Sequence, residues 1–158
     1  MAVRLVRENG EDILREPARP VKRFDDSLRR LIEDMFDTMY CYQGVGLAAP
    51  QIGVPKRIIV MDVEGIKLEL INPEILETHG EDVDSEGCLS VPGVYGEVKR
   101  AARVRVRGQR VSGETCEIEA AGLLSRCFQH EIDHLNGILF IDRAVNLERV
   151  RPSEEEDE

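Results

Sequence analysis

The segment GLLSRCFQHEIDHLNG, residues 122 to 137, predicts a helix that carries a metal site. Its apolar residues recur at the spacing of one helix face, and Gly137 supplies a C-terminal stop. Residues four apart on a helix are neighbours, so His130 and His134 would point the same way, with Glu131 beside them. These are the parts of an H-E-x-x-H site, in which two imidazoles bind a metal ion and the carboxylate accepts a proton from water.

The alternative is that both histidines are ordinary surface or core residues of an amphipathic helix. A lone histidine would be interpreted that way, but this chain has only 3 histidines and two of them flank a glutamate at helical spacing. The metal interpretation therefore needs a third ligand. A metzincin site is excluded because Phe140 stands where its third histidine belongs. A thermolysin-type glutamate would be Glu154, which lies in a terminal charge run that nothing would hold rigid.

A cysteine upstream offers a better third ligand. The chain has 4 cysteines, and Cys41, Cys116 and Cys127 fit the interpretation of small, buried, apolar residues. Cys88 differs because it lies in EGCLS, followed by the turn-rich VPG, where a thiolate can face a cleft. A Cys-His-His set leaves the fourth position of a tetrahedral metal open, as in catalytic sites.

The glycine-rich segment GVGLAAPQ, residues 44 to 51, imitates a dinucleotide-binding fingerprint, with Asp62 downstream. We exclude that function because the segment follows a helix instead of a strand. In addition, Pro50, Gly53 and Pro55 should keep any helix from starting where a pyrophosphate would need one. Two interpretations remain, a glycine-rich turn without function or a wall of the active site.

Taken together, GVGLAAPQ (44–51), EGCLS (86–90) and QHEIDHL (129–135) resemble, in this order, the three signature motifs of peptide deformylase. The resemblance spans nearly the whole chain and leaves out only its C-terminal end. It implies a hydrolase that removes the formyl group from the N-terminal formyl-methionine of newly made polypeptides and releases formate. The partners implied are N-formylmethionyl peptides and nascent chains, with ribosome association left open.

The resemblance also assigns site residues. Cys88, His130 and His134 would hold one divalent ion, and Glu131 would pass the proton from water to the departing amine. Gln51, through its side-chain amide, and Leu89, through its backbone N–H, would donate to the oxyanion. The methionine pocket would consist of Gly44, Val45, Gly46, Leu123 and Cys127. Gly44 and Gly46 would let substrate backbone approach closely, while Leu123 and Cys127 could equally be plain core.

The identity of the metal stays open at this level. A thiolate with two imidazoles suits both Zn²⁺ and Fe²⁺. The resemblance favours Fe²⁺ as the physiological ion, with Zn²⁺, Ni²⁺ or Co²⁺ as alternatives.

Composition predicts a single compact catalytic domain over residues 1–152, followed by an acidic tail, 153–158, expected to be disordered. The last five residues are all acidic and carry half of the net charge of −10. No segment is apolar enough for a membrane span or a signal peptide, so we expect a cytoplasmic protein whose thiols stay reduced.

A basic run lies between residues 99 and 110. Its members are Lys99, Arg100, Arg103, Arg105, Arg107 and Arg110. Because the rest of the chain is acidic, we interpret this run as a solvated strand face and expect no direct contact with nucleic acid. Arg100 could pair with Glu86 and fix the loop beside Cys88.

The predicted fold class is α+β, with antiparallel sheets packed around the central metal-binding helix and a second helix at about residues 25–40. Residues 57–63 and 67–72 should form a hairpin through Glu64 and Gly65. Further strands are expected at 98–111, 115–120 and 138–141.

Two rival functions share the HEIDH motif. A metallopeptidase that cuts internal bonds would need a wider cleft and another third ligand. A binding protein with a structural metal would need a fourth protein ligand, and His79 is the only histidine left.

Overall fold

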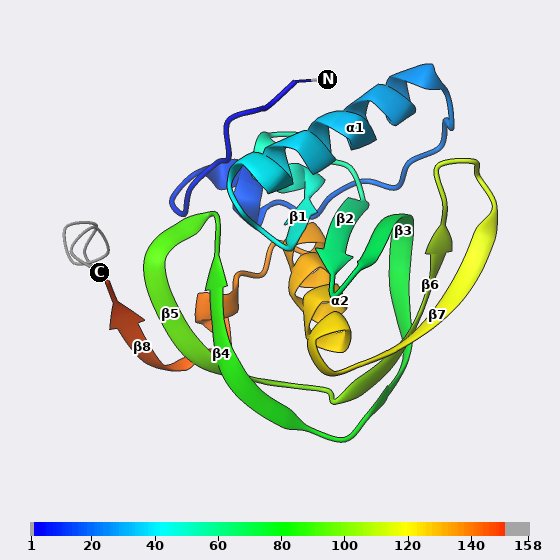
Figure 1. Ribbon diagram of the computed structural model, residues 1–158. Coiled ribbons are helices and arrows are strands. Elements are labelled where there is room, and N and C mark those ends of the chain that lie inside the picture. Colours follow the sequence, from blue (N-terminus) through cyan, green and yellow to red (C-terminus); the bar gives the residue numbers. More distant parts are fainter. Residues whose placement is uncertain (1, 151–158) are drawn as a thin grey trace.

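The computed structural model describes residues 2–150, which form an α+β fold (Figure 1). The α-helices are α1 (Asp26–Cys41) and α2 (Gly122–Leu135), and short 3₁₀ helices span Asp12–Arg15 (η1), Ala49–Ile52 (η2) and Phe140–Asp142 (η3). The strands are β1 (Gly46–Ala48), β2 (Ile58–Val63), β3 (Ile66–His79), β4 (Asp82–Cys88), β5 (Val91–Arg100), β6 (Arg103–Gln109), β7 (Thr115–Ala121) and β8 (Val145–Arg149).

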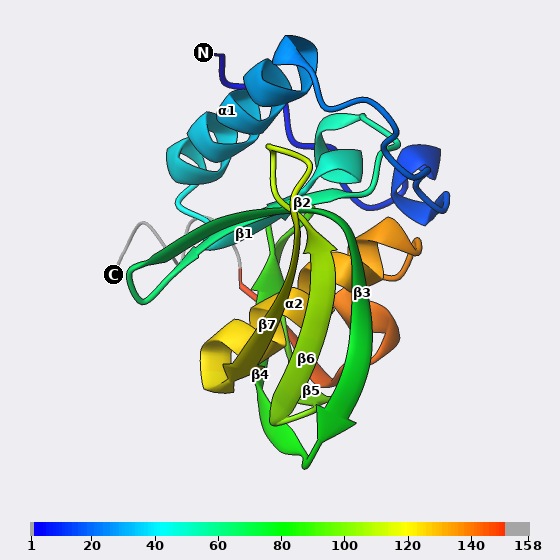
Figure 2. The same ribbon diagram turned by 90° about the vertical axis from the view of Figure 1, so that its right-hand side faces the viewer.

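The strands form two antiparallel sheets with α2 between them (Figure 1). The larger sheet has the order β1-β2-β3-β6-β7, and the smaller has the order β4-β5-β8. Figure 2 shows α1 lying over the end of the larger sheet that holds β1 and β2. The predicted arrangement of antiparallel sheets around the metal-binding helix is therefore confirmed.

Strand β2 is apolar on both faces because it separates two cores. Successive side chains of a strand point to opposite sides. Ile59 and Met61 pack in the core that contains Phe128 of α2, and Ile58 and Val60 pack in the core beneath α1. Ile58, Ile59, Val60 and Met61 are all fully buried. This strand fixes both helices relative to the larger sheet.

The predicted helix and hairpin are confirmed by their local chemistry. Asp25 caps α1 by accepting a hydrogen bond from the backbone N–H of Leu28 at 3.0 Å. The β2–β3 hairpin turns through Glu64 and Gly65, with φ values of 50° and 83°. Two adjacent positive φ values are typical of a type I′ turn, whose twist matches the flanking strands.

The prediction of a single strand at 98–111 is wrong. The strand is interrupted at residues 101–102, and the segments on either side belong to different sheets. Helix α2 causes the break. The N–H of Ala101 donates to Gln129 Oε1 at 2.9 Å, and its carbonyl accepts from Ser125 Oγ at 3.0 Å. These bonds take Ala101 out of the strand ladder. Sequence periodicity carries no signal for such a long-range contact.

Three smaller expectations also fail. Residues 138–141 form no strand, because Asp142 caps the turn of η3 by accepting from the N–H of Leu139 at 3.0 Å. A short helix does begin after GVGLA, since Pro50 fits the first turn of η2. Cys41 is exposed at the end of α1 instead of buried, and Cys116 is only half-buried.

The basic run is not one solvated face. Arg100 is buried, while Arg105, Arg107 and Arg110 each form an ion pair with a glutamate of β3.

Within the described part of the chain, no helix is long and apolar enough to cross a membrane. Both the predicted tail, 153–158, and Glu154 lie outside the described residues.

The C-terminal end of α2 depends on a glycine. Gly137 has a φ of 76°, and a Cβ built there would lie 2.5 Å from the carbonyl oxygen of Arg15. We expect Gly137→Ala to lower the free energy of unfolding by about 3 kcal/mol or more, since left-handed strain and a backbone clash add. Gly65→Ala is the control, because its φ is 83° but no atom lies within 4 Å of its Cβ. It should cost only about 1–2 kcal/mol. If urea unfolding showed equal losses of free energy in the two variants, the proposed clash with the Arg15 carbonyl would be contradicted.

Candidate metal centre and cleft

The structure brings together the three residues that the sequence predicted as metal ligands. Cys88 is the last residue of β4, and His130 and His134 lie on α2. Their ligand atoms all lie within 4.8 Å of one another, and Cys88 Sγ is 3.3 Å from His134 Nε2. Cys88 lies at the end of the β4–β5 hairpin, where it pairs with Val91 across the turn at residues 89–90.

The donor set fits a metal ion with an open coordination position. One thiolate and two imidazoles are ligands for Fe²⁺ and Zn²⁺. The group contains three residues among those described, and His79 lies elsewhere, exposed on β3 beside Glu77. Glu131 is buried next to this group, and its Oε1 has no hydrogen-bond partner within residues 2–150. A buried carboxylate oxygen without a protein partner is satisfied by water or ligand.

Glu86 orients one of the histidines. Its Oε1 lies 2.8 Å from His130 Nδ1, so the imidazole carries its proton on Nδ1 and leaves Nε2 for a metal. Arg100 forms two hydrogen bonds of 2.9 Å to the same carboxylate, and Arg126 forms a third at 2.6 Å. The predicted pair of Glu86 and Arg100 is therefore confirmed, but it is buried and belongs to a larger network.

Burial acts in opposite ways on the two carboxylates. It raises the pKa of Glu131 to about 7, because no hydrogen bond compensates for the lost water. Burial alone would also raise the pKa of Glu86, but hydrogen bonds from Arg100 and His130 hold it well below its ordinary value. Glu86 is thus a permanent charge that positions its neighbours, whereas Glu131 has the environment of a group that exchanges a proton.

Gln51 is held rigidly between the first two motifs. Its side chain is 2% exposed, and its Oε1 accepts from the N–H of Ala48 at 2.9 Å. Its Nε2 donates to Ser90 Oγ at 3.0 Å and lies 3.6 Å from Cys88 Sγ. The N–H side of the amide therefore faces the Cys-His-His group. Leu89 lies in the turn that follows Cys88 and packs partly against the core under α1.

The two glycines of the first motif have a role that the sequence did not reveal. A Cβ on Gly46 would lie 2.6 Å from Glu131 Oε2 and 2.8 Å from Cys127 Sγ. A Cβ on Gly44 would lie 2.9 Å from Leu89 Cδ1. The space beside each backbone is therefore taken by the protein's own side chains. Gly46 is needed so that the Glu131 carboxylate can approach β1.

A cleft of about 700 Å³ opens over the Cys-His-His group. All five residues predicted for the methionine pocket line it, namely Gly44, Val45, Gly46, Leu123 and Cys127. Leu123 is 46% exposed and therefore belongs to the wall of the cleft and not to the core. Cys127 lines the cleft and also packs in the hydrophobic core. Burial raises the pKa of the Cys127 thiol well above its ordinary value, and the charge of Glu131 adds to this effect. Cys127 therefore presents a neutral, apolar surface to the cleft.

Sequence reasoning missed several lining residues. Leu5, Tyr42, Tyr95 and Arg126 also face the cleft. Leu5 comes from the N-terminal segment, which crosses the site and donates from the N–H of Arg7 to the carbonyl of Gln51 at 2.6 Å. No local pattern marks this segment as part of a site. Arg126 lies on the predicted helix, but only the fold shows that its guanidinium binds Glu86.

Comparisons with known proteins agree with this geometry. The family model "Polypeptide deformylase" matches residues 3–150. The peptide deformylase of Carboxydothermus hydrogenoformans is 60% identical over 149 residues, covering 94% of this chain and 98% of the relative. The crystal structure of the Thermotoga maritima enzyme has a TM-score of 0.90 at 47% identity, covering 92% and 99% of the two chains. The Synechococcus elongatus enzyme, solved in complex with actinonin, has a TM-score of 0.87 at 49% identity, covering 89% and 78%.

The buried network predicts a large cost for removing one charge. Glu86→Gln removes the carboxylate that Arg100 and Arg126 share. Arg100 keeps its ion pair with Asp133 at 2.7 Å, but buried Arg126 keeps only Asp82 as an ion-pair partner, 3.7 Å away. We therefore expect a loss of about 3 kcal/mol in the free energy of unfolding. Glu77→Gln is the control, since Glu77 binds Arg105 on the surface with its side chain 51% exposed. Its effect should be far smaller, because exposed ion pairs contribute little. Similar losses in urea unfolding would show that the network does not stabilise the fold.

Proposed function

Because the chain belongs to the peptide deformylase family, we propose roles for the residues that surround its metal-dependent reaction. The reaction itself follows from the family: the chain removes the N-formyl group from the N-terminal formyl-methionine of newly made polypeptides. This membership decides against an internal metallopeptidase and against a protein with only a structural metal. The observation that supports the residue roles is the convergence of Cys88, His130 and His134 within 4.8 Å beside Glu131.

Cys88, His130 and His134 would hold the metal ion. When bound, a divalent cation there supplies Lewis acidity that makes water a nucleophile near neutral pH. We propose Fe²⁺ as the physiological ion, with Zn²⁺, Ni²⁺ or Co²⁺ able to replace it. The thiolate supports this choice of borderline-soft ions, because hard ions such as Mg²⁺ prefer oxygen ligands.

Glu131 is the proposed general base and acid. Its unpartnered, buried Oε1 stands beside the Cys-His-His group, where it can accept a proton as water attacks the formyl carbon. The same carboxyl group then gives the proton to the amine as the C–N bond breaks. The products are formate and a peptide with a free N-terminus. Gly46 keeps the carboxylate in place, since any larger residue would displace it.

Gln51 and Leu89 are the proposed donors to the oxyanion. The Nε2 of Gln51 faces the site and is fixed by bonds at both ends of the amide, so little reorganisation is needed when charge develops. The backbone N–H of Leu89 lies in the residue that follows Cys88. Leu89 lies in the turn of the β4–β5 hairpin that supplies Cys88. Gln51 lies on η2 and is joined to the same turn by its hydrogen bond to Ser90.

The methionine side chain would occupy the wall formed by Gly44, Val45, Gly46, Leu123 and Cys127. A flexible thioether packs well against apolar groups of this kind. The actinonin complex of the Synechococcus relative supports a cleft that accepts a small ligand. The protonated, buried thiol of Cys127 is consistent with this role, because it offers no charge to the substrate.

The substrate class also suggests where the chain works. Formylated N-termini arise during translation, so we propose that residues 1–152 form one catalytic domain that meets nascent chains in the cytoplasm. The 4 cysteines support a reducing compartment, since all are free in the structure.

Formate release from a formyl-Met peptide tests both the reaction and the role of Glu131. We expect the metal-loaded chain to release formate and Glu131→Ala to lose about 10²–10⁴ in kcat while it keeps its metal. Glu117→Ala, on the exposed face of β7, should behave like the parent chain. Near-normal turnover by Glu131→Ala would remove this residue from the mechanism, and no formate release by the parent chain would overturn the function.

Metal analysis of protein prepared without oxygen tests the ligand set. We expect about one iron per chain in the parent and a sharp loss in Cys88→Ala, because two imidazoles alone bind weakly. Cys116→Ala is the matched control and should change stability only. Full metal occupancy in Cys88→Ala would contradict the Cys-His-His assignment. Zinc in place of iron in the parent would overturn the choice of Fe²⁺.

A further inference from the structure

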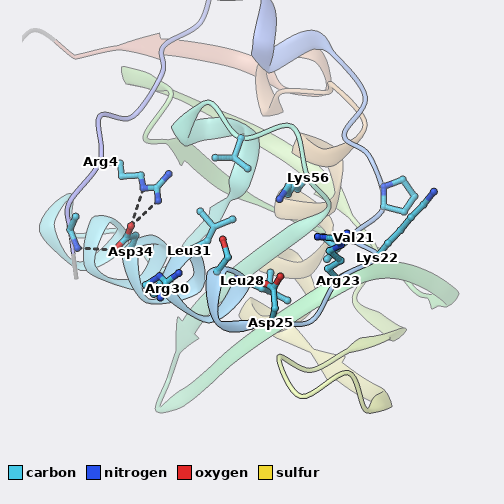
Figure 3. Close-up of a pocket in the computed structure, with 14 residues that line it drawn as sticks. Arg4, Val21, Lys22, Arg23, Asp25, Leu28, Arg30, Leu31, Asp34 and Lys56 are labelled. Carbon is cyan, nitrogen blue, oxygen red and sulfur yellow. Dashed lines mark hydrogen bonds and ion pairs between the residues drawn. The ribbon is translucent and has the colours of Figure 1, made fainter.

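A second cleft, of about 800 Å³, lies on another part of the molecule (Figure 3). Its walls are the N-terminal segment, the loop that precedes α1, the first half of α1 and the loop that follows η2. It shares no lining residue with the cleft over the Cys-His-His group. The mechanism proposed above makes no use of it.

The lining of this cleft includes four cations that have no ion-pair partner among the described residues, namely Lys22, Arg23, Arg30 and Lys56. All four residues are exposed, and their side chains make no hydrogen bond or ion pair with any residue in the described range. Figure 3 shows Lys56 on the opposite side of Leu28 and Leu31 from Arg30, with Lys22 and Arg23 on the preceding loop. All four residues therefore line one cleft, although the Lys22 side chain extends outward from it.

The two carboxylates that line the cleft offset the positive charges of its lining only in part. Asp34 binds Arg4, with 2.8 Å between Oδ2 and Nη2. Asp25 caps α1 and accepts from the N–H of Leu28 at 3.0 Å. This cap places the Asp25 carboxylate on the positive end of the helix dipole, so these two charges largely offset each other. The cleft is thus locally cationic in a chain whose net charge is −10.

The unpaired cations of this cleft differ from the basic run at residues 99–110. On β6, Arg105 and Arg107 are paired with glutamates, and so is Arg110 just beyond the strand. Those cations stabilise contacts between neighbouring strands. The unpaired cations instead collect from separate segments, 22–30 and 56, at one cleft. Flexible cationic side chains around a hollow are typical of sites for phosphate groups.

The lining also limits the ligand. Its floor contains the buried side chains of Leu28 and Leu31, and none of its described lining residues is aromatic. Without an aromatic platform, there is nothing on which a nucleobase could stack, so recognition would rest on phosphate oxygens. The volume lies within the range of about 300–1,000 Å³ that is usual for small-molecule sites. We propose that this cleft binds a compact anion that carries two or more phosphate groups.

Calorimetric titration of the metal-loaded full chain with inorganic tripolyphosphate, and separately with ATP, tests this proposal. We expect saturable binding that weakens as salt is raised from about 50 to 200 mM, because the contacts are exposed to solvent. Arg30→Ala and Lys56→Ala should each weaken binding roughly fivefold, and the double variant should weaken it further. Formate release should stay unchanged in all of them.

Arg103→Ala is the matched control, because Arg103 is an exposed arginine on β6 outside this cleft. Polyphosphates also chelate metal ions, so the decisive quantity is the difference between the cleft variants and this control. Equal affinity for tripolyphosphate and ATP would show that the site recognises the phosphate groups alone. Tighter binding of ATP would show that the site also contacts the nucleoside. Unchanged affinity in the cleft variants, no saturable binding of either probe, or cleft-dependent binding of a short RNA alone would overturn the proposal.

Discussion

The carboxylate of Glu86 is the contact on which the rest of the site depends. It comes from β4, and it binds Arg100 at the end of β5 together with Arg126 and His130 on α2. One buried negative charge therefore fastens the three-stranded sheet to the central helix. The arginines neutralise it, and it in turn fixes the tautomer of His130. Cys88 stands two residues along the same strand, so the network that holds the sheet also places the thiolate opposite the histidines.

Glu131 places a second constraint on how helix α2 packs. Burial raises the pKa of the Glu131 carboxyl group to about 7, and burial of a carboxylate without partners costs stability. The fold accommodates it through Gly46, where the absence of a Cβ leaves space for Oε2 against β1. The Oε1 of Glu131 is buried and has no hydrogen-bond partner within residues 2–150. The pKa values of the Glu86 and Glu131 carboxyl groups thus shift in opposite directions because only Glu86 is paired with cations.

The first motif contributes mainly by packing. Gly44 accommodates Leu89, Gly46 accommodates Glu131, and Gln51 is bonded to Ala48 and Ser90. The N-terminal segment crosses above and bonds to the carbonyls of Gln51 and Ser90 at 2.6 and 2.7 Å. The three motifs are therefore locked into one rigid body at the site. In the proposed reaction this rigidity would keep the donors to the oxyanion already in place.

The sequence by itself determined the helix 122–135, the hairpin at Glu64 and Gly65, the family, and the identity of the Cys-His-His group. These depend on local spacing and on motifs that short segments carry complete. Only the tertiary structure decided that residues 98–111 form two strands, that Glu86 is buried between two arginines, and that Gly46 leaves space for Glu131. It also showed that the arginines of β6 are mostly paired, whereas unpaired cations gather from distant segments. Each of these facts is a contact between residues far apart in the chain, and hydrophobic periodicity carries no information about such contacts.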